Sequence, residues 1–118
     1  MAKTVFIAHP ISGDVENNVK KVIAICEAIH SKDVIPVFPS FTWRQYLTDR
    51  PGDKALAHAV NEEYFKRGMV DEVWFYGDRM SDGMREEAKL ARSFGITVVG
   101  KSRETMSGLL EMEFANNG

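Results

Sequence analysis

The sequence predicts an α/β protein built on a parallel β-sheet of four to five strands flanked by helices. Short apolar runs rich in β-branched and aromatic residues alternate with segments of helical periodicity along the chain. These runs are apolar at nearly every position, as expected of strands covered on both faces. No internal repeat, low-complexity tract or linker interrupts the pattern, so residues 1–118 are expected to form a single domain. The expected architecture is a three-layer, Rossmann-like or flavodoxin-like fold.

The N-terminal part supplies two strands and one helix. Residues 4–8 (TVFIA) form the first expected strand, and the proline and glycine of the following HPISGD mark a loop. Asp14 is a good N-cap for the next helix. The apolar face of that helix is expected to carry Val15, Val19, Val22, Ile23, Cys26 and Ile29. Residues 34–38 (VIPVF) form the second strand, and Pro36, which lacks an N–H, suits an edge position.

The rest of the chain begins with an irregular segment, PSFTWRQYLTDRPGD (residues 39–53), whose length indicates a functional or lid-like loop. A helix is expected to follow with Asp53 as its cap. The later elements are expected at residues 53–69 (helix), 72–77 (strand), 81–95 (helix), 96–100 (strand) and 104–115 (helix). In parallel sheets, ligands bind at the carboxyl ends of the strands, where the chain order reverses. The loops HPISGD, PSFTW and DRMSDG are therefore expected to meet at one edge and form the binding site.

Composition excludes several classes of function. The net charge of −2 gives no electrostatic footprint for nucleic acid or an anionic membrane. The single cysteine, Cys26, excludes an internal disulfide and a multi-cysteine metal site. The three histidines are dispersed along the sequence, so no metal site is expected. The first residues lack the apolar run of a signal peptide or membrane span, so a cytoplasmic location is expected.

One glutamate occupies an unusual position in the helix expected at residues 81–95. At about 100° per residue, Glu87 falls within the apolar stripe of that helix. The other members of the stripe are Met84, Ala88, Leu90, Ala91 and Phe94. A buried carboxylate is costly unless it is paired, and burial raises its pKa. Glu87 either bonds to a backbone group or lies exposed through rotation of the helix, or it is a catalytic group beside an anion-binding helix N-terminus at Ser81 to Gly83.

Other residues are weaker candidates. Glu63 also interrupts an apolar stripe, but the sequence alone slightly favours a solvated surface role for it, and Glu62 is an alternative candidate. His9 ends the first strand and either contacts substrate or bonds to local backbone. Trp43 and Arg44, with Tyr46, lie in the long loop. They could stack on a planar base, pair with a phosphate or simply pack.

The segment VDEVWFYGDRMSDGMREEAKLARSFGITVV resembles the nucleoside 2-deoxyribosyltransferase superfamily, including the deoxynucleoside-monophosphate N-glycosidases. The whole chain resembles small bacterial and phage proteins placed beside that superfamily, which share an opening like FIAHPISGD. The resemblance implies that Glu87 is the catalytic glutamate, framed by Gly83, Ala91 and Gly95. It implies that Ser81 contacts a 5′-phosphate and that Asp71 opens the third strand.

The resemblance also implies the remaining site residues. Glu63 takes the place of the family's second acid, where an aspartate is usual. The expected substrate-binding residues are His9, Ser12, Gly13, Ser81, Gly83, Met84 and Ser107. Ser107 corresponds to a serine that a neighbouring subunit donates in some members. The first loop departs from the family's Gly/Ser-rich or aromatic turn, so the identity of the substrate is not implied.

The implied reaction is cleavage or transfer at the N-glycosidic bond of a (deoxy)nucleoside or its 5′-monophosphate, through two carboxylates and an oxocarbenium-like transition state. Water as acceptor makes the enzyme a hydrolase, and a second base makes it a transferase. No metal or organic cofactor is implied, and a homodimer or higher homo-oligomer is expected. Two alternatives remain open: a non-catalytic nucleotide-binding or sensing module, and a scaffold that meets a protein partner through exposed Trp43, Tyr46 and Tyr64.

Overall fold

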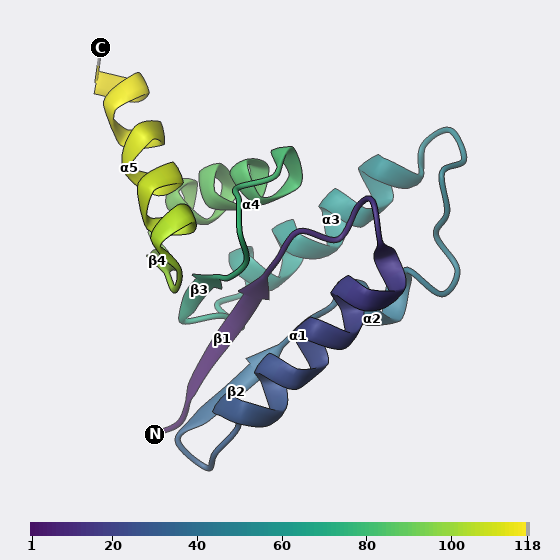
Figure 1. Ribbon diagram of the computed structural model, residues 1–118, viewed down its shortest axis with the longest axis horizontal. Coiled ribbons are helices and arrows are strands. Elements are labelled where there is room, and N and C mark those ends of the chain that lie inside the picture. Colours follow the sequence, from purple (N-terminus) through teal and green to yellow (C-terminus); the bar gives the residue numbers. More distant parts are fainter. Residues whose placement is uncertain (118) are drawn as a thin grey trace.

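The computed structural model describes residues 1–117, which contain one four-stranded, all-parallel sheet with strand order β2-β1-β3-β4 (Figure 1). The strands are β1 (Lys3–Ala8), β2 (Val34–Val37), β3 (Glu72–Phe75) and β4 (Thr97–Gly100). The helices are α1 (Val15–Ile29), α2 (Ser40–Trp43), α3 (Asp53–Lys66), α4 (Asp82–Ser93) and α5 (Arg103–Asn117). The predicted α/β class, the parallel sheet and the edge position of the proline-containing strand are confirmed.

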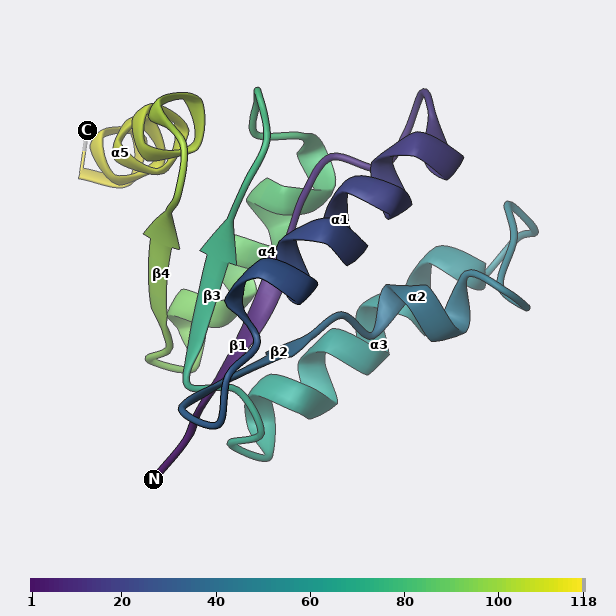
Figure 2. The same ribbon diagram turned by 60° about the horizontal axis from the view of Figure 1, so that its bottom comes forward.

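Helices cover both faces of the sheet because side chains alternate along each strand. Val5 and Ile7 of β1 pack on one face against α1, where Val22 is fully buried. Phe6 and Ala8 point to the other face, into a core shared with α3, α4 and α5. Figure 2 shows α1 on one side of the sheet and α4 on the other. The predicted three-layer, Rossmann-like architecture follows from this alternation.

Helix α1 begins as predicted, but its apolar face is less buried than its periodicity suggested. The carboxylate of Asp14 accepts a hydrogen bond from the Asn17 N–H at 3.4 Å. Val15 and Ile23 are 49% and 47% exposed, because only part of the stripe reaches the sheet. Cys26 is free and half-buried.

The predictions for the segment before α3 and for α3 itself need three corrections. The irregular segment contains the short helix α2, and α3 ends at Lys66 rather than at residue 69. The N-cap of α3 is Gly52, with φ of +89°, and not Asp53. The Asp53 carboxylate is turned back into the loop instead, where it accepts hydrogen bonds from the Thr48 N–H at 2.8 Å and from Arg50 Nε at 3.1 Å. Asp53 therefore closes the loop that joins α2 to α3.

The strand order creates a switch point between β1 and β3. From β1 the chain proceeds through α1 to β2 on one side, and from β3 it proceeds through α4 to β4 on the other. The connections therefore diverge at the carboxyl ends of these two neighbouring strands, which is the usual ligand position in such sheets.

Candidate functional site

A pocket of about 1010 Å³ opens at this switch point. It lies at the upper end of the range of about 300–1,000 Å³ that is usual for small-ligand sites. The loop after β1 contributes His9 and Ser12, α2 contributes Trp43 and the adjacent Arg44, and the start of α4 contributes Ser81. The three loops that the sequence places at one edge of the sheet do line one pocket. Helix α3 completes the wall.

Glu87 lies in the pocket wall, in the second turn of α4. Its neighbours on the same helix face, Met84, Ala88 and Ala91, are buried in the core, so the helix orientation predicted from periodicity is confirmed. The Glu87 side chain is half-buried, because it borders the pocket as well as the core. Burial raises its pKa from 4.5 to about 8, opposed by the charge of Arg44. At neutral pH, Glu87 is therefore mostly protonated. It ionises when the pH rises, or when a bound ligand changes its surroundings so that its pKa falls.

Arg44 approaches the same space from a different element. It follows α2, lines the pocket and is half-buried. Burial lowers the pKa of its guanidinium, while the negative charges of Glu87 and Asp49 act in the opposite direction. Arg44 and Glu87 influence each other without forming a direct ion pair, which would require an N–O distance of 4.0 Å or less. A cation and an acid thus border the same pocket with space for ligand atoms.

The α2 segment presents polar atoms without partners. Ser40 Oγ, Trp43 Nε1 and Arg44 Nε are shielded from water and have no hydrogen-bond partner. All three residues line the pocket. The Arg44 guanidinium carbon lies 4.9 Å from the centre of the Trp43 ring, so each side chain restricts the other's orientation. Buried unsatisfied polar groups are rare in folded proteins and are costly, which makes this segment a candidate ligand contact.

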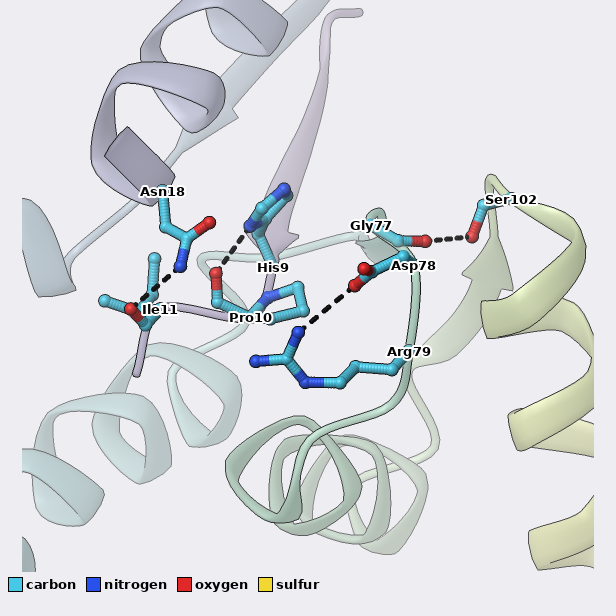
Figure 3. A network of polar contacts seen from close by, with 8 residues as sticks. All are labelled: His9, Pro10, Ile11, Asn18, Gly77, Asp78, Arg79 and Ser102. Carbon is cyan, nitrogen blue, oxygen red and sulfur yellow. Dashed lines mark hydrogen bonds and ion pairs between the residues drawn. The ribbon is translucent and has the colours of Figure 1, made fainter. Parts of the chain in front are cut away.

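His9 is held by its own loop. Its Nδ1–H donates to the Pro10 carbonyl at 2.6 Å, as Figure 3 shows, which leaves Nε2 as the acceptor nitrogen of a neutral ring. Burial lowers the pKa of His9, and the Pro10 carbonyl acts in the opposite direction. Asn18 of α1 donates to the Ile11 carbonyl at 3.0 Å and fixes the same loop. His9 is thus a pre-positioned neutral side chain at the edge of the pocket.

The loop after β3 lies beside the His9 loop and is held by polar contacts. Ser102 Oγ donates to the Gly77 carbonyl at 2.7 Å, and Arg79 pairs with Asp78 at 3.2 Å (Figure 3). Gly77 has φ of +105°, and a Cβ there would lie 2.6 Å from Pro10 Cδ. Only glycine allows the loops after β1 and β3 to approach this closely.

The N-terminus of α4 lines the pocket with Ser81, Gly83 and Met84. Ser81 is the N-cap, and its Oγ accepts a hydrogen bond from the Met84 N–H at 3.3 Å. The remaining N–H groups of the first turn, together with the helix dipole, favour a negatively charged ligand group. Glu87 follows one and a half turns later on the same helix.

Three predicted site residues lie outside the pocket. Glu63 is exposed on α3 and pairs with Arg67 at 2.7 Å. The Arg67 side chain lowers the pKa of Glu63, so Glu63 is a surface carboxylate and does not join Glu87 within one chain. The apolar stripe it seemed to interrupt is itself partly exposed, with Leu56 at 57%. Gly13 is exposed and absent from the lining, and Ser107 is exposed on α5.

The pocket contains residues that the sequence did not indicate. Lys54, His58 and Asn61 line it from α3, and Glu86 lies at its rim. Lys54, His58 and Asn61 are spaced by four and three residues, so they lie on one face of α3. Periodicity cannot reveal this role, because a polar stripe facing a pocket has the same pattern as one facing water.

Within residues 1–117, no cluster of three or more histidine, cysteine, aspartate or glutamate side chains is arranged to hold a metal ion. No helix in that part of the chain is long and apolar enough to cross a membrane.

Comparison with known proteins places the chain in a family. Residues 3–101 match the family described as Domain of unknown function (DUF7768). The chain belongs to this family. The DUF7768 match extends from β1 to the end of β4, so it includes every loop that lines the pocket. A search of curated proteins finds no significant match.

A solved structure shares the fold. The crystal structure of a conserved protein from Enterococcus faecalis V583 matches with a TM-score of 0.61 and 18% sequence identity. The match covers 85% of this chain and 63% of that one, so the chain spans less than two thirds of that protein's length. At this identity the likeness supports the Rossmann-like fold of the DUF7768 domain alone.

Proposed function

We propose that this protein cleaves the N-glycosidic bond of a (deoxy)nucleoside or its 5′-monophosphate, with Glu87 as the catalytic carboxylate. The observation that carries the proposal is the position of Glu87: a half-buried acid in a pocket wall, with a pKa raised to about 8. A carboxyl perturbed by burial inside a cleft is a typical functional group. The resemblance of the surrounding segment to N-glycosidases and deoxyribosyltransferases supplies the reaction class.

The substrate is oriented by α4. Its 5′-phosphate or 5′-hydroxyl binds at the N-terminus of the helix, beside Ser81 and Gly83, where free N–H groups and the helix dipole favour an anion. A helix rises about 1.5 Å per residue, so the six residues from Ser81 to Glu87 span about 9 Å. The 5′-phosphorus and C1′ of a nucleotide are joined by only five bonds, which span less than this rise, and the Glu87 side chain, which points back toward the helix N-terminus, can cover the remaining distance. Glu87 is thereby directed at C1′.

In the reaction, the ionised Glu87 carboxylate bonds to C1′ while the bond between C1′ and the base nitrogen breaks. The base leaves with the electron pair of that bond and takes up a proton. Water then attacks C1′ and releases Glu87. The net change is the addition of one water molecule, whose hydroxyl ends on C1′ and whose second hydrogen is balanced by the proton that the base takes up. If a second base attacks instead of water, the product is a new nucleoside.

The second acid expected from the resemblance is not in the pocket, because Glu63 faces solvent and pairs with Arg67. This observation favours a second candidate function, a nucleotide-binding or sensing module that retains the pocket without turnover. A rise in melting temperature with nucleotides, without release of free base, would support that candidate.

The proposal includes self-association. Ser107 lies on α5 outside its own pocket, so it reaches a substrate only if it belongs to a neighbouring copy. On the same helix, Met106, Leu110 and Phe114 are 55%, 54% and 74% exposed and recur every four residues. Such an apolar stripe suits helix packing between subunits.

The test is incubation of the protein with a mixed panel of nucleosides, deoxynucleosides and their 5′-monophosphates, with products read by mass spectrometry. We expect at least one member to release its free base. Absence of release from every member between pH 6 and pH 9 would reject the proposed reaction.

A further inference from the structure

We propose that α2 and Arg44 recognise the base of the substrate and select bases with a carbonyl oxygen at purine C6 or pyrimidine C4, as in hypoxanthine and uracil, over adenine and cytosine, which carry an amino group there. The inference rests on the proposed function, because it requires a base bound in the pocket opposite Glu87. It concerns three residues that the reaction scheme above does not use: Ser40, Trp43 and Arg44.

The position of the base follows from the other two ends of the substrate. The phosphate or 5′-hydroxyl occupies the N-terminus of α4, and C1′ faces Glu87. A nucleophile and its leaving group lie on opposite faces of the carbon that is attacked. The base therefore lies on the side of C1′ away from Glu87. Arg44 borders the pocket from α2, outside ion-pair distance of Glu87 yet within range of its charge.

The chemistry of the α2 wall determines which base it accepts. Trp43 Nε1 and Arg44 Nε are donors only, and both lack a partner. Ser40 Oγ, also without a partner, can donate as well. The Arg44 guanidinium lies over the Trp43 ring, so one face of the indole is already occupied by a cation. Hydrogen bonds from donor edges, rather than stacking between the rings, are therefore the readout.

Donors without partners match carbonyl oxygens and reject amino groups. An amino group placed against Trp43 Nε1 and Arg44 would leave these donors without acceptors, and its own N–H groups would be further donors without acceptors. Loss of partners for buried donors weakens binding by at least about tenfold. Both nitrogen atoms are shielded from water, so ligand binding is expected to draw these side chains towards the base.

The same donors assist departure of the base. As the bond to C1′ breaks, negative charge develops on the base and spreads to its carbonyl oxygen. A guanidinium beside that oxygen stabilises the charge without donating its proton. Arg44 thus supplies part of the leaving-group stabilisation that the resemblance assigns to Glu63, which faces solvent.

The experiment measures binding separately from turnover. A Glu87→Gln protein, which is not expected to turn over, is titrated by calorimetry with two matched pairs of 5′-monophosphates: inosine against adenosine, and uridine against cytidine. We expect the inosine and uridine monophosphates, which carry an oxygen where adenosine and cytidine carry an amino group, to bind at least about tenfold more tightly than their partners. Trp43→Phe or Arg44→Gln, each added to Glu87→Gln, should reduce this preference to less than about twofold.

Tyr46→Phe is the matched control, because Tyr46 is an exposed aromatic in the same segment at 60% exposure and should leave the preference intact. Equal affinity within both pairs, or a preference that survives both α2 substitutions, would overturn the inference. So would a uniform loss of affinity for all four nucleotides in Arg44→Gln, because that pattern marks a phosphate or sugar contact. Circular dichroism and melting of each variant exclude misfolding as the cause.

The outcomes separate this inference from the proposed function. A preference for the inosine and uridine monophosphates that depends on α2, in a protein that releases no base from any substrate, would reject cleavage and support the ligand class. Release of bases without any such preference would support cleavage and reject the role of α2. Failure of all four nucleotides to bind would overturn the inference.

Discussion

Replacing Glu87 with glutamine is expected to change how the stability of the protein depends on pH. Burial raises the pKa of Glu87 from 4.5 to about 8 in the folded protein. In the unfolded chain the carboxyl ionises near its ordinary value, so between these two values folding takes up a proton. The stability contributed by this group is complete below the unfolded pKa and is lost as the pH rises through the folded pKa.

The magnitude follows from the size of the shift. One pKa unit corresponds to about 1.36 kcal/mol. With the folded pKa near 8, raising the pH from 5 to 8 removes about 3 kcal/mol of stability through this single group. Glutamine has no titrating proton and keeps the size of the side chain. The free energy of unfolding of Glu87→Gln minus that of the wild type should therefore increase by about 3 kcal/mol between pH 5 and pH 8.

Urea denaturation followed by tryptophan fluorescence at pH 5, 6, 7 and 8 measures this difference. Glu63→Gln is the matched control, because it makes the same substitution on an exposed residue of α3. Arg67 lowers the pKa of Glu63, so its contribution is lost only when the pH falls through that lowered value and is constant from pH 5 to pH 8. Parallel curves for wild type and Glu87→Gln would refute the assignment of a strongly perturbed acid to this position.

Three further predictions concern the site and its surroundings. If the ionised form of Glu87 attacks C1′, kcat/KM should rise about tenfold per pH unit and level off above a pH of about 8. A value of kcat/KM that falls as the pH rises would contradict this role. Ser81→Ala should lower the free energy of unfolding by about 1 kcal/mol through loss of the N-cap. It should also weaken the binding of 5′-monophosphates more than the binding of nucleosides. Equal loss of affinity for both, measured by calorimetry, would exclude a phosphate contact. Leu110→Asp on the exposed stripe of α5 should convert a dimer to a monomer in light scattering, and a wild-type protein that is already monomeric would contradict a shared site.

The fold could be predicted because its signals are local and redundant. After their first residues, the β1 and β3 strands are apolar runs, and a strand buried on both faces allows few other patterns. Pro36 indicated an edge strand, and β2 is at the edge. The meeting of three loops followed from topology alone, since the carboxyl ends of parallel strands share one edge. Within α4, burial of Met84 and Ala91 confirmed the orientation that directs Glu87 to the pocket.

The site was harder to predict where side-chain direction depends on tertiary contacts. Asp53 is in the position of an N-cap, but Arg50 and the Thr48 N–H draw its carboxylate into the loop. Glu63 interrupts an apolar stripe in sequence, yet that face of α3 is partly in water and Arg67 lies one turn away. The lining residues of α3 carried no signal, because a polar helix face is the same whether it meets solvent or a cavity.

The most direct test of the account is the rate of free-base release by wild type, Glu87→Gln and Glu63→Gln at pH 8, on whichever nucleoside or nucleotide the wild type cleaves fastest. The account predicts that Glu87→Gln loses at least about a hundredfold in rate, comparable to loss of a principal catalytic group, while its circular dichroism is unchanged. It predicts that Glu63→Gln retains the wild-type rate, because Glu63 faces solvent on α3. Wild-type activity in Glu87→Gln would contradict the account.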